Sequence, residues 1–287
     1  MFLKLKPSKI FLLALVPTLF ISQPSFSQAK QIDNEQTKLI TEDGNKIGFQ
    51  KPSIASKNSY SILSLNNDLN TDVHKDEELL KETISINPSQ SNSTINIPFN
   101  IGDDERIILE KDENGKADGA AAIYNEKDDT IGIISTPTIE DENRLEISSV
   151  SLKDKNTLQL KLESKDVNNT EVNNLSVALA ATYYSTYFSS GKWITRDGLV
   201  SLSLTHKPYL FSGTTNERSL KRSDSWNKVK AVHSGNSKWK NTSGLYDQYA
   251  CHLGTIGSRK NPYNLEPARP DVSYAATVGW ACNPPIK

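Results

Sequence analysis

Cysteine and histidine are scarce in this 287-residue chain, which has two of the first and four of the second. The histidines lie far apart, without the short spacing that is typical of a zinc site. They are His74, His206, His233 and His252. The sequence also contains no complete catalytic motif and no glycine-rich cradle for a cofactor. We therefore predict neither a bound metal ion nor a cofactor.

A long apolar run near the N-terminus is also missing. The apolar segment at residues 10–21 is shorter than the roughly 20 residues that a membrane-spanning helix needs, and Pro17 interrupts it. Three lysines precede it and small polar residues follow as far as Ala29, which is the order of a secretory signal peptide. We predict a signal peptide over residues 1–29, rather than a retained anchor. The mature chain is expected to be secreted and extracellular, without a transmembrane segment.

The chain has almost no net charge, with 33 basic and 34 acidic residues, but the two signs are unevenly distributed. Residues 192–287 contain 14 Lys or Arg and 6 Asp or Glu, a net charge of +8. Residues 30–191 contain 16 basic and 28 acidic residues, a net charge of −12. Such asymmetry bears on partners and solubility rather than on fold. Two neighbouring domains that differ in surface charge would be its simplest explanation.

Residues 30–93 are rich in Asn, Ser, Lys, Asp and Glu and contain few aromatic residues. Such a composition buries too little apolar surface to offset the conformational entropy that is lost on ordering. We predict that this segment is largely disordered, with a helical turn or two over residues 76–82, and that it serves as a linker or pro-segment.

Apolar and polar residues alternate in six short segments between residues 94 and 165, with the two-residue period of a half-buried strand. The segments are 94–101, 106–110, 120–124, 130–134, 144–148 and 157–162. Turn-forming clusters rich in Asn, Asp and Lys separate several of them. This spacing predicts a small, acidic, antiparallel β domain over residues 94–165.

Two of these segments resemble a module of secreted bacterial proteins. Gly-Ala-Ala-Ala-Ile at 119–123 and Gly-Ile-Ile-Ser-Thr-Pro at 132–137 carry the resemblance. In those proteins the module precedes various C-terminal domains, which implies a carrier or pro-domain rather than a catalytic role.

Residues 166–191 are predicted to connect this domain to the next. They include the most apolar stretch of the mature chain, residues 175–188. Its Ala-rich start favours helix, and its Tyr- and Thr-rich end favours strand. We interpret it as a boundary element that packs into the following domain, in preference to a membrane-active segment.

Residues 192–287 are predicted to form a compact α+β domain of about 95 residues, which is large enough for its own core. A strand is expected over 199–206, after a turn at Asp197 and Gly198. A helix follows through Trp226, Val229 and Val232, and either Asp224 or Ser225 would cap it. A second helix is expected over 245–252 and a last strand over 272–280. Tyr246, Tyr249 and Ala250 would lie on the buried face of the second helix.

Cys251 and Cys282 are the only cysteines of a chain that is expected to be exported. A single intramolecular disulfide is the simplest interpretation, because extracellular compartments are oxidising. It would close a loop of about 30 residues and stabilise the fold by about 3 to 4 kcal/mol. The alternative is a reactive thiol paired with His252 or His233. The predicted fold class is therefore α+β: a disordered N-terminal segment, a small antiparallel β domain and a compact, disulfide-linked α+β C-terminal domain.

The C-terminal sequence resembles a bacterial family. Trp193, Ser-Leu-Ser-Leu at 201–204 and Trp-Asn-Lys-Val at 226–229 begin the match. More specific motifs follow: Gly-Leu-Tyr-Asp-Gln-Tyr-Ala-Cys-His at 244–252, Asn-Leu-Glu-Pro-Ala-Arg-Pro at 264–270 and Cys-Asn-Pro at 282–284. Their order is similar to the family catalogued as domain of unknown function 2599, although Tyr263 stands where relatives favour tryptophan. The family has no assigned function, so the resemblance implies a boundary and a disulfide but no mechanism.

A catalytic site would be available if four polar residues converged. His252, Glu266, Arg269 and Asp271 would supply a base, two carboxylates and an anion-binding guanidinium. A secreted hydrolase that uses His252 and Glu266 is therefore the alternative functional hypothesis. The prolines that frame Glu266 and Arg269 favour instead a rigid loop held by an internal Glu–Arg pair.

The favoured hypothesis is a secreted, non-enzymatic effector or surface-binding protein, antibacterial or toxin-like. Its basic domain would bind anionic cell-wall polymers or membrane surfaces, rather than nucleic acid, through cations beside aromatic rings. The predicted binding residues are Lys221, Arg222, Trp226, Lys228, Lys230, Lys238, Trp239 and Lys240. The acidic region would mask the basic domain until proteolysis. A third hypothesis is a matrix or envelope component with no small ligand.

Overall fold

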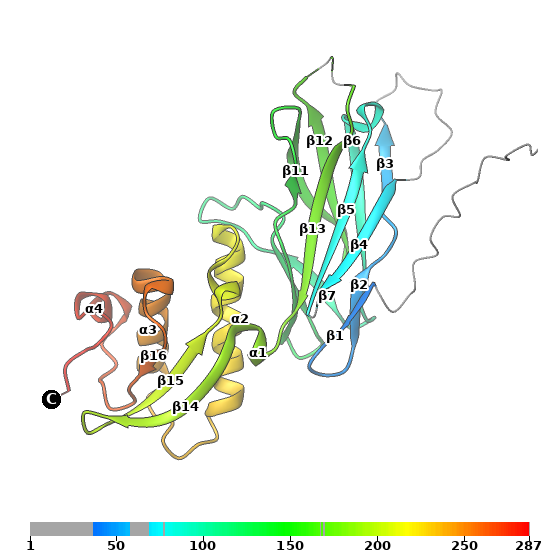
Figure 1. Ribbon diagram of the computed structural model, residues 1–287. Helices are drawn as coiled ribbons and strands as arrows, with labels where there is room; N and C mark the ends of the chain where they lie inside the picture. The colour runs from blue at the N-terminus through cyan, green and yellow to red at the C-terminus, as the bar shows by residue number, and fades with distance from the viewer. Residues whose placement is uncertain (1–36, 58–68, 77, 167, 169, 287) are drawn as a thin grey trace, which may run out of the picture. The chain divides into compact units, whose positions relative to one another are not determined.

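The computed structural model describes residues 37–57, 69–76, 78–166, 168 and 170–286, which belong to one compact unit. The fold is mixed, with mostly antiparallel sheets and few helices (Figure 1). Residues 1–29 lie outside the described residues, so the signal peptide stays a prediction. No helix within the described ranges is both long and apolar enough to cross a membrane.

The first sheet has six antiparallel strands. They are β1 (Lys38–Ile40), β2 (Lys46–Phe49), β3 (Ser53–Lys57), β6 (Ser93–Asn100), β11 (Leu145–Asp154) and β12 (Thr157–Ser164). They are hydrogen-bonded in the order β1-β2-β6-β12-β11, and β3 also pairs with β6. Because β6 pairs with β2, β3 and β12, this sheet is assembled around it.

The second sheet has seven antiparallel strands. They are β4 (Asn70–Asp76), β5 (Leu79–Ile86), β7 (Arg106–Leu109), β8 (Ala121–Tyr124), β9 (Thr130–Ile134), β10 (Thr138–Ile139) and β13 (Asn173–Ala181). Their order is β4-β5-β13-β9-β8-β7, and β10 also pairs with β13. A short 3-10 helix, η1 (Pro88–Gln90), links β5 to β6 and thus joins the two sheets.

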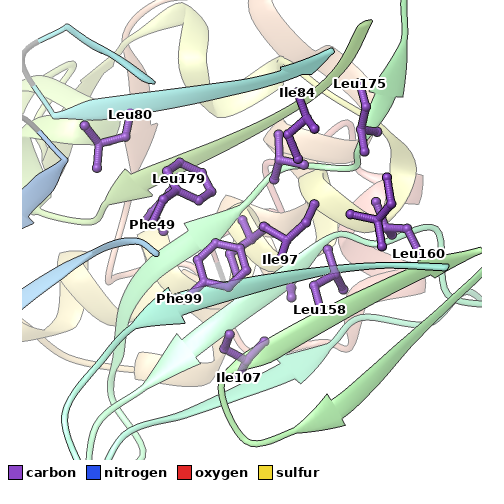
Figure 2. Close-up of a cluster of buried hydrophobic side chains, with 14 of the residues drawn as sticks. Phe49, Leu80, Ile84, Ile97, Phe99, Ile107, Leu158, Leu160, Leu175 and Leu179 are labelled. Carbon is purple, nitrogen blue, oxygen red and sulfur yellow. The ribbon is translucent and has the colours of Figure 1, made fainter. Parts of the chain in front are cut away.

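The two sheets form a sandwich around one hydrophobic core, because their strands alternate between inward apolar and outward polar side chains. In β5, Leu80 and Ile84 are fully buried, whereas Lys81 between them is exposed. Figure 2 shows these two side chains in the same cluster as Ile97 and Phe99 of β6. The core therefore draws on strands from both sheets.

The six strands predicted between residues 94 and 165 are confirmed as β6, β7, β8, β9, β11 and β12. The prediction of disorder over residues 30–93 is wrong for the described part, which contains β1 to β5. The helical turn predicted over residues 76–82 is also wrong for its described residues, because β4 ends at Asp76 and β5 begins at Leu79. These short strands gain burial from distant partners, as Leu80 does opposite Leu179, which average composition does not reveal. The domain boundaries stay predictions.

The C-terminal region, residues 188–286, combines a small sheet with helices. Its strands are β14 (Phe188–Arg196), β15 (Leu199–His206) and β16 (Tyr263–Leu265), paired in that order. Its helices are η2 (Pro208–Phe211), α2 (Thr215–His233), α3 (Thr242–Cys251), the π-helical turn η3 (His252–Ile256), η4 (Gly257–Arg259) and α4 (Tyr274–Gly279). One turn of helix, α1 (Tyr184–Tyr187), precedes β14, so the apolar stretch at 175–188 is a strand followed by a helical turn. The prediction that this stretch packs into the following domain is wrong for its first part, because β13 lies within the second sheet and in the sandwich core.

The predicted strand over residues 199–206 is confirmed as β15. It forms a hairpin with β14, and the turn residues Asp197 and Gly198 have φ values of 52° and 77°. Positive φ at both positions fits the right-handed twist of a two-residue hairpin turn. Leu202 and Leu204 of β15 are fully buried in the core of the C-terminal region.

The helix predicted through Trp226 and Val229 is confirmed as α2, but it begins earlier than the predicted cap. The side chain of Thr214 accepts a hydrogen bond from the backbone N–H of Glu217 and thus caps its first turn. Trp226 and Val229 are buried, whereas Val232 is 54% exposed.

The second predicted helix is confirmed as α3, with Tyr249 and Ala250 buried. Tyr246 was expected on the same buried face, and the structure places it at the surface, 38% exposed.

The last predicted strand, over residues 272–280, is wrong, because α4 occupies it. Ser273 accepts a hydrogen bond from the N–H of Ala276, and the hydroxyl of Thr277 donates to the Ser273 carbonyl. These local bonds favour a helix.

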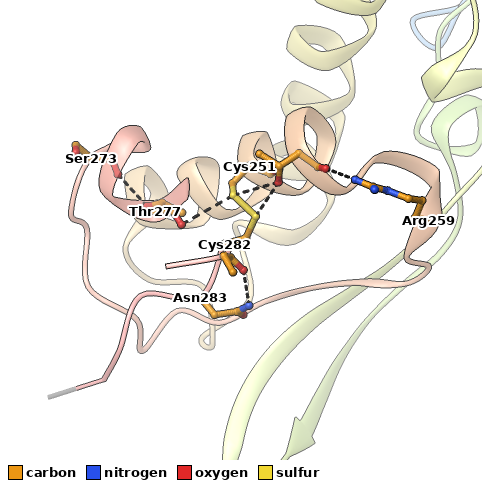
Figure 3. Close-up of a disulfide and its surroundings, with 8 residues drawn as sticks. Cys251, Arg259, Ser273, Thr277, Cys282 and Asn283 are labelled. Carbon is orange, nitrogen blue, oxygen red and sulfur yellow. Dashed lines mark hydrogen bonds between the residues drawn. A yellow bond between two sulfur atoms is a disulfide. The ribbon is translucent and has the colours of Figure 1, made fainter. Parts of the chain in front are cut away.

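The predicted disulfide is confirmed. Cys251, the last residue of α3, is bonded to Cys282, and both are fully buried (Figure 3). The described residues contain no free cysteine, so the alternative of a reactive thiol is wrong. The bond ties α3 to the segment that follows α4, across a sequence separation of 31 residues.

Glu82 interrupts the apolar interior of the sandwich. It lies on β5 in the inward register of Leu80 and Ile84 and is 1% exposed. Its Oε2 atom has no hydrogen-bond partner among the described residues. Burial raises the pKa of Glu82 to about 8, because the charged carboxylate would lose its hydration there.

Glu82 is therefore predicted to make the sandwich less stable at alkaline pH. The pKa of Glu82 is about 8 in the folded chain and 4.5 in the unfolded chain. Its contribution to stability is therefore complete below pH 4.5 and is lost as the pH rises through about 8. Between about pH 5 and about pH 9, the parent should lose as much as about 4 kcal/mol of its free energy of unfolding through this group, and Glu82→Gln should not show this loss. Urea unfolding at about pH 5 and about pH 9 measures this difference. Parallel pH profiles for the parent and the variant would contradict it.

Candidate functional site

Glu266, which directly follows β16, lies at the centre of a buried hydrogen-bond network and is 1% exposed. Its Oε2 accepts from Nε of Arg269 at 2.6 Å. Its Oε1 accepts from Oγ of Ser201 at 3.1 Å and from Nη2 of Arg196 at 3.3 Å. Gln248 of α3 accepts from the Glu266 N–H at 2.9 Å and donates to its carbonyl at 3.1 Å. The network thus joins β14, β15 and α3 to the proline-framed loop.

Arg269 extends this network towards the end of the chain. Its Nη1 donates to the carbonyl of Pro284 at 2.8 Å, and its own carbonyl accepts from Nδ2 of Asn241 at 2.7 Å. Asn241 also caps α3. The internal Glu–Arg pair that the prolines favoured is therefore confirmed, and it fixes the loop in place.

The other two residues of the hydrolase hypothesis do not take part in this hydrogen-bond network, although the Glu266 charge acts on His252. His252 is completely buried, and its ring stacks on Tyr263 with the ring centroids 4.9 Å apart. Asp271 is exposed near Asp247, whose pKa is raised by burial and, to a lesser extent, by the Asp271 charge. In the part of the chain that the structure describes, no group of three or more His, Cys, Asp or Glu is placed to hold a metal ion.

His252 is held in its neutral form. Neither ring nitrogen makes a hydrogen bond of normal geometry with a described residue. Burial lowers the pKa of His252 to about 4, and the charge of Lys260 acts in the same direction. The nearby backbone of Asn264 acts in the opposite direction without preventing the decrease.

Replacement of His252 by Phe is predicted to protect the fold against acid. A lowered pKa stabilises the folded chain fully above the ordinary value of 6.5, and this contribution is lost as the pH falls through about 4. Between about pH 7.5 and about pH 4, the parent should lose up to about 3 kcal/mol more of its free energy of unfolding than His252→Phe. Urea unfolding monitored by tryptophan fluorescence measures this. Equal losses in both proteins would contradict the assignment.

Three of the eight residues that were predicted to bind anions lie inside the fold. Lys221 is 2% exposed and pairs with Oε2 of Glu217 at 3.3 Å. Lys228 pairs with Oε2 of Glu42 at 2.8 Å. Trp226 belongs to the core of the C-terminal region. These three side chains are therefore already engaged within the chain.

The other five are more accessible. Arg222 and Lys230 are half-buried on α2, and Lys238 and Lys240 are exposed in the loop that follows. Trp239 lies between the two lysines and donates its Nε1–H to the first residue of α3 at 2.9 Å. The structure thus groups Lys238, Trp239 and Lys240 on one short loop, apart from the buried cations.

Acidic side chains of the C-terminal sequence are buried more often than basic ones. Three of the six acidic residues in 192–287 are buried, namely Glu217, Asp224 and Glu266. Among the basic residues of this range that the structure describes, only Lys221 and Lys228 are buried. The exposed charge is therefore more one-sided than the composition indicates.

Helix α2 packs on the outer face of the second sheet. Leu220 contacts a small apolar cluster formed by Ala120, Ala122 and Ile133 in and beside β8 and β9. Ala120 and Ala122 are fully buried, and their small side chains allow the helix to approach the sheet closely. Small, outward-facing alanines beside Ile133 are the sequence signal for this contact.

The segment after β9 holds the first turn of α2. The N–H of Thr136 donates to Oε1 of Glu217 at 3.0 Å, and the hydroxyls of Thr136 and Thr214 are 3.0 Å apart. Gly119 has a φ of 100°, and a Cβ there would lie 2.3 Å from the ring of Pro137. The two segments that resemble a module of secreted proteins therefore form the platform for α2.

A polar cavity of about 290 Å³ lies beside this contact. Glu42, Thr130, Asp224 and Lys228 are among its lining residues. Asp224 is 2% exposed and accepts a hydrogen bond from the hydroxyl of Tyr187 at 2.7 Å. Burial raises the pKa of Asp224 to about 6, although Lys228 and Tyr187 act in the opposite direction.

A second cavity, of about 220 Å³, lies between α2 and η3, and we call it the arginine pocket. It is lined by Leu210, Phe211, Thr215, Arg218, Ser219, Arg222, Leu253 and Gly254. Of these, the sequence pattern predicted Arg222 only. The four-residue spacing of Arg218 and Arg222, which places both on one side of a helix, is the signal that could have found the pair.

The fold is an antiparallel β-sandwich joined to a mixed C-terminal region that one disulfide closes. Residues 188–285 match the family described as "Protein of unknown function (DUF2599)". The match begins at the first residue of β14 and confirms the resemblance of the C-terminal motifs. No curated protein matches the chain, and no solved structure matches it.

Proposed function

We propose that this chain is a secreted, non-enzymatic bacterial protein whose C-terminal region binds anionic components of a cell envelope. The observation that carries the proposal is the one-sided exposure of charge. Arg222, Lys230, Lys238 and Lys240 are accessible, whereas half of the acidic side chains in residues 192–287 are buried. Exposed cations on a fixed scaffold attract anionic polymers and lipid head groups.

The contact between the acidic sandwich and α2 supports a second part of the proposal, in which the sandwich masks part of the basic surface. Nζ of Lys228 pairs with Glu42 at 2.8 Å and donates to the carbonyl of Thr130 at 3.3 Å. Glu217, near the start of the same helix, accepts from the backbone of Thr136. In this proposal, proteolysis of the sandwich releases α2 and exposes further cations.

The geometry favours binding over hydrolysis. A general base must reach the proton that it removes. Both oxygens of Glu266 are occupied by hydrogen-bond donors, and His252 is completely buried against Tyr263. We therefore do not adopt the hydrolase hypothesis.

Replacement of both Lys238 and Lys240 by Ser is predicted to weaken binding to anionic vesicles by roughly tenfold or more. Each surface cation contributes about 1 kcal/mol beside an anionic membrane. Cosedimentation with phosphatidylglycerol-containing vesicles, at low and at physiological salt, measures the affinity. The matched control is Lys111→Ser with Lys153→Ser, which removes the same charge from exposed positions of the sandwich. Equal losses in the two variants, or binding that salt does not weaken, would contradict the proposal.

The mask is tested by Glu42→Gln, which removes the partner of Lys228. Binding to the same vesicles should become about twofold to fivefold stronger, since the loss of a partly exposed ion pair is worth a fraction of a kcal/mol to about 1 kcal/mol. The control is Glu113→Gln, which changes the net charge equally at an exposed turn between β7 and β8. If the two variants bind equally well, net charge alone explains the effect and the mask is wrong.

A further inference from the structure

We propose that the arginine pocket binds the phosphate group of an anionic phospholipid and that exposed apolar side chains of α4 enter the same bilayer surface. This inference rests on the proposed binding of anionic envelope components. It names the partner as a phospholipid bilayer and assigns the residues that contact it.

The lining of the pocket suits a phosphate group. Arg218 and Arg222 are one helical turn apart on α2, and Thr215 and Ser219 have the same spacing. Guanidinium groups bind phosphate oxygens through paired hydrogen bonds, and hydroxyl groups donate to the remaining oxygens. The described lining contains no acidic side chain that would neutralise the arginines.

Hydrogen bonds position Arg218, and neither arginine is neutralised by a carboxylate. Nη1 of Arg218 donates to the carbonyl of Gly213 at 2.6 Å, and Nη2 donates to the hydroxyl of Thr215 at 3.3 Å. The side chain of Arg222 makes no hydrogen bond or ion pair with another described residue. The cations Lys221 and Lys228, in contrast, already have carboxylate partners.

The pocket lies on the side of α2 that faces away from the sandwich. Leu220, which contacts the sandwich, is two residues from both Arg218 and Arg222. Two residues correspond to about 200° around a helix, so the arginines project from the opposite side. The contact that holds Lys228 therefore leaves this pocket uncovered.

The size and walls of the pocket fit a lipid head group. Its volume of about 220 Å³ is below the roughly 300–1,000 Å³ of pockets for drug-sized ligands. Leu210, Phe211 and Leu253 supply apolar walls beside the arginines. A phospholipid would place its phosphate on the arginines and its glycerol and first acyl carbons against these walls.

Helix α4 brings Tyr274 next to the pocket, and Val278 of α4 and Trp280 directly after it are further exposed apolar side chains. Gly254 lines the pocket, and a Cβ there would lie 3.0 Å from the hydroxyl of Tyr274. Tyr274, Val278 and Trp280 are 43%, 36% and 56% exposed. Tyr274 and Val278 are one helical turn apart and share a face. Tyr and Trp are the side chains that favour the head-group level of a bilayer.

The buried side of α4 is fixed to the fold. Thr277 is 1% exposed, and its carbonyl accepts from the N–H of Cys282 at 2.9 Å. Cys282 is in turn bonded to Cys251 at the end of α3 (Figure 3). Because the exposed side chains are held on a fixed support, they lose little freedom on binding.

The first test uses the full mature chain with vesicles of phosphatidylcholine alone and with vesicles that also contain phosphatidylglycerol. Arg218→Gln with Arg222→Gln should weaken binding to the anionic vesicles by about tenfold or more. The control, Lys192→Gln with Lys207→Gln, removes the same charge from the same region and should weaken it by less than about threefold. Far-ultraviolet circular dichroism and the melting temperature verify that each variant is folded.

The second test concerns α4. Trp280→Ser should weaken binding by about fivefold or more, whereas Val232→Ser, at another exposed apolar position, should leave it within about twofold. The tryptophan emission of the parent should shift to shorter wavelength with anionic vesicles, and this shift should be clearly smaller in Trp280→Ser.

Two results would overturn the inference. If Arg218→Gln with Arg222→Gln binds as well as its lysine control, the pocket is not the phosphate site. The wider proposal would still stand if Lys238→Ser with Lys240→Ser retains its effect. If millimolar inorganic phosphate abolishes vesicle binding while Trp280→Ser binds normally, the ligand is a soluble phosphate and not a bilayer.

Discussion

Helix α2 is packed on two sides, and the described fold depends on both contacts. Towards the sandwich, Leu220 lies on Ala122 and its small neighbours on the outer face of the second sheet. Towards the C-terminal region, Trp226 and Val229 enter the second core. A helix covered on two sides has little surface left for polar groups, so each charged residue must find a partner inside or reach water.

This constraint divides the cations of α2 into two groups. Lys221 and Lys228 are buried and have carboxylate partners, as a charge in the interior requires. Arg218 and Arg222 face the arginine pocket, where no carboxylate meets them. The acidic side chain of Glu266 is also withdrawn from the surface. Hydrogen-bond donors occupy both of its carboxylate oxygens. Structural stability and a cationic surface thus follow from one arrangement of charges.

The pattern within one segment, or the count of a rare residue type, was sufficient for some features. Alternation predicted β15, and two cysteines in a chain that was expected to be exported predicted the disulfide. Distant partners were not predictable: β5 gains its burial from β13, and Lys228 gains its ion pair from Glu42.

The segment of α4 was predicted as a strand because its apolar residues fit either structure, whereas the cap at Ser273 favours a helix. Arg222 was predicted, but the pocket around it was not, because part of its lining, such as Phe211 and Leu253, comes from other segments of the chain.

The central claim is that the protein meets an anionic surface through α2, the loop that carries Lys238 and Lys240, and α4, and not through the sandwich. Hydrogen exchange of the protein, with and without phosphatidylglycerol-containing vesicles, tests it most directly, because it reports protection segment by segment. The account predicts slower exchange over residues 215–222 and 238–240, at 253–254 and in α4, with no change in β5 and β13. Protection confined to the sandwich strands, or equal protection by phosphatidylcholine vesicles, would contradict it.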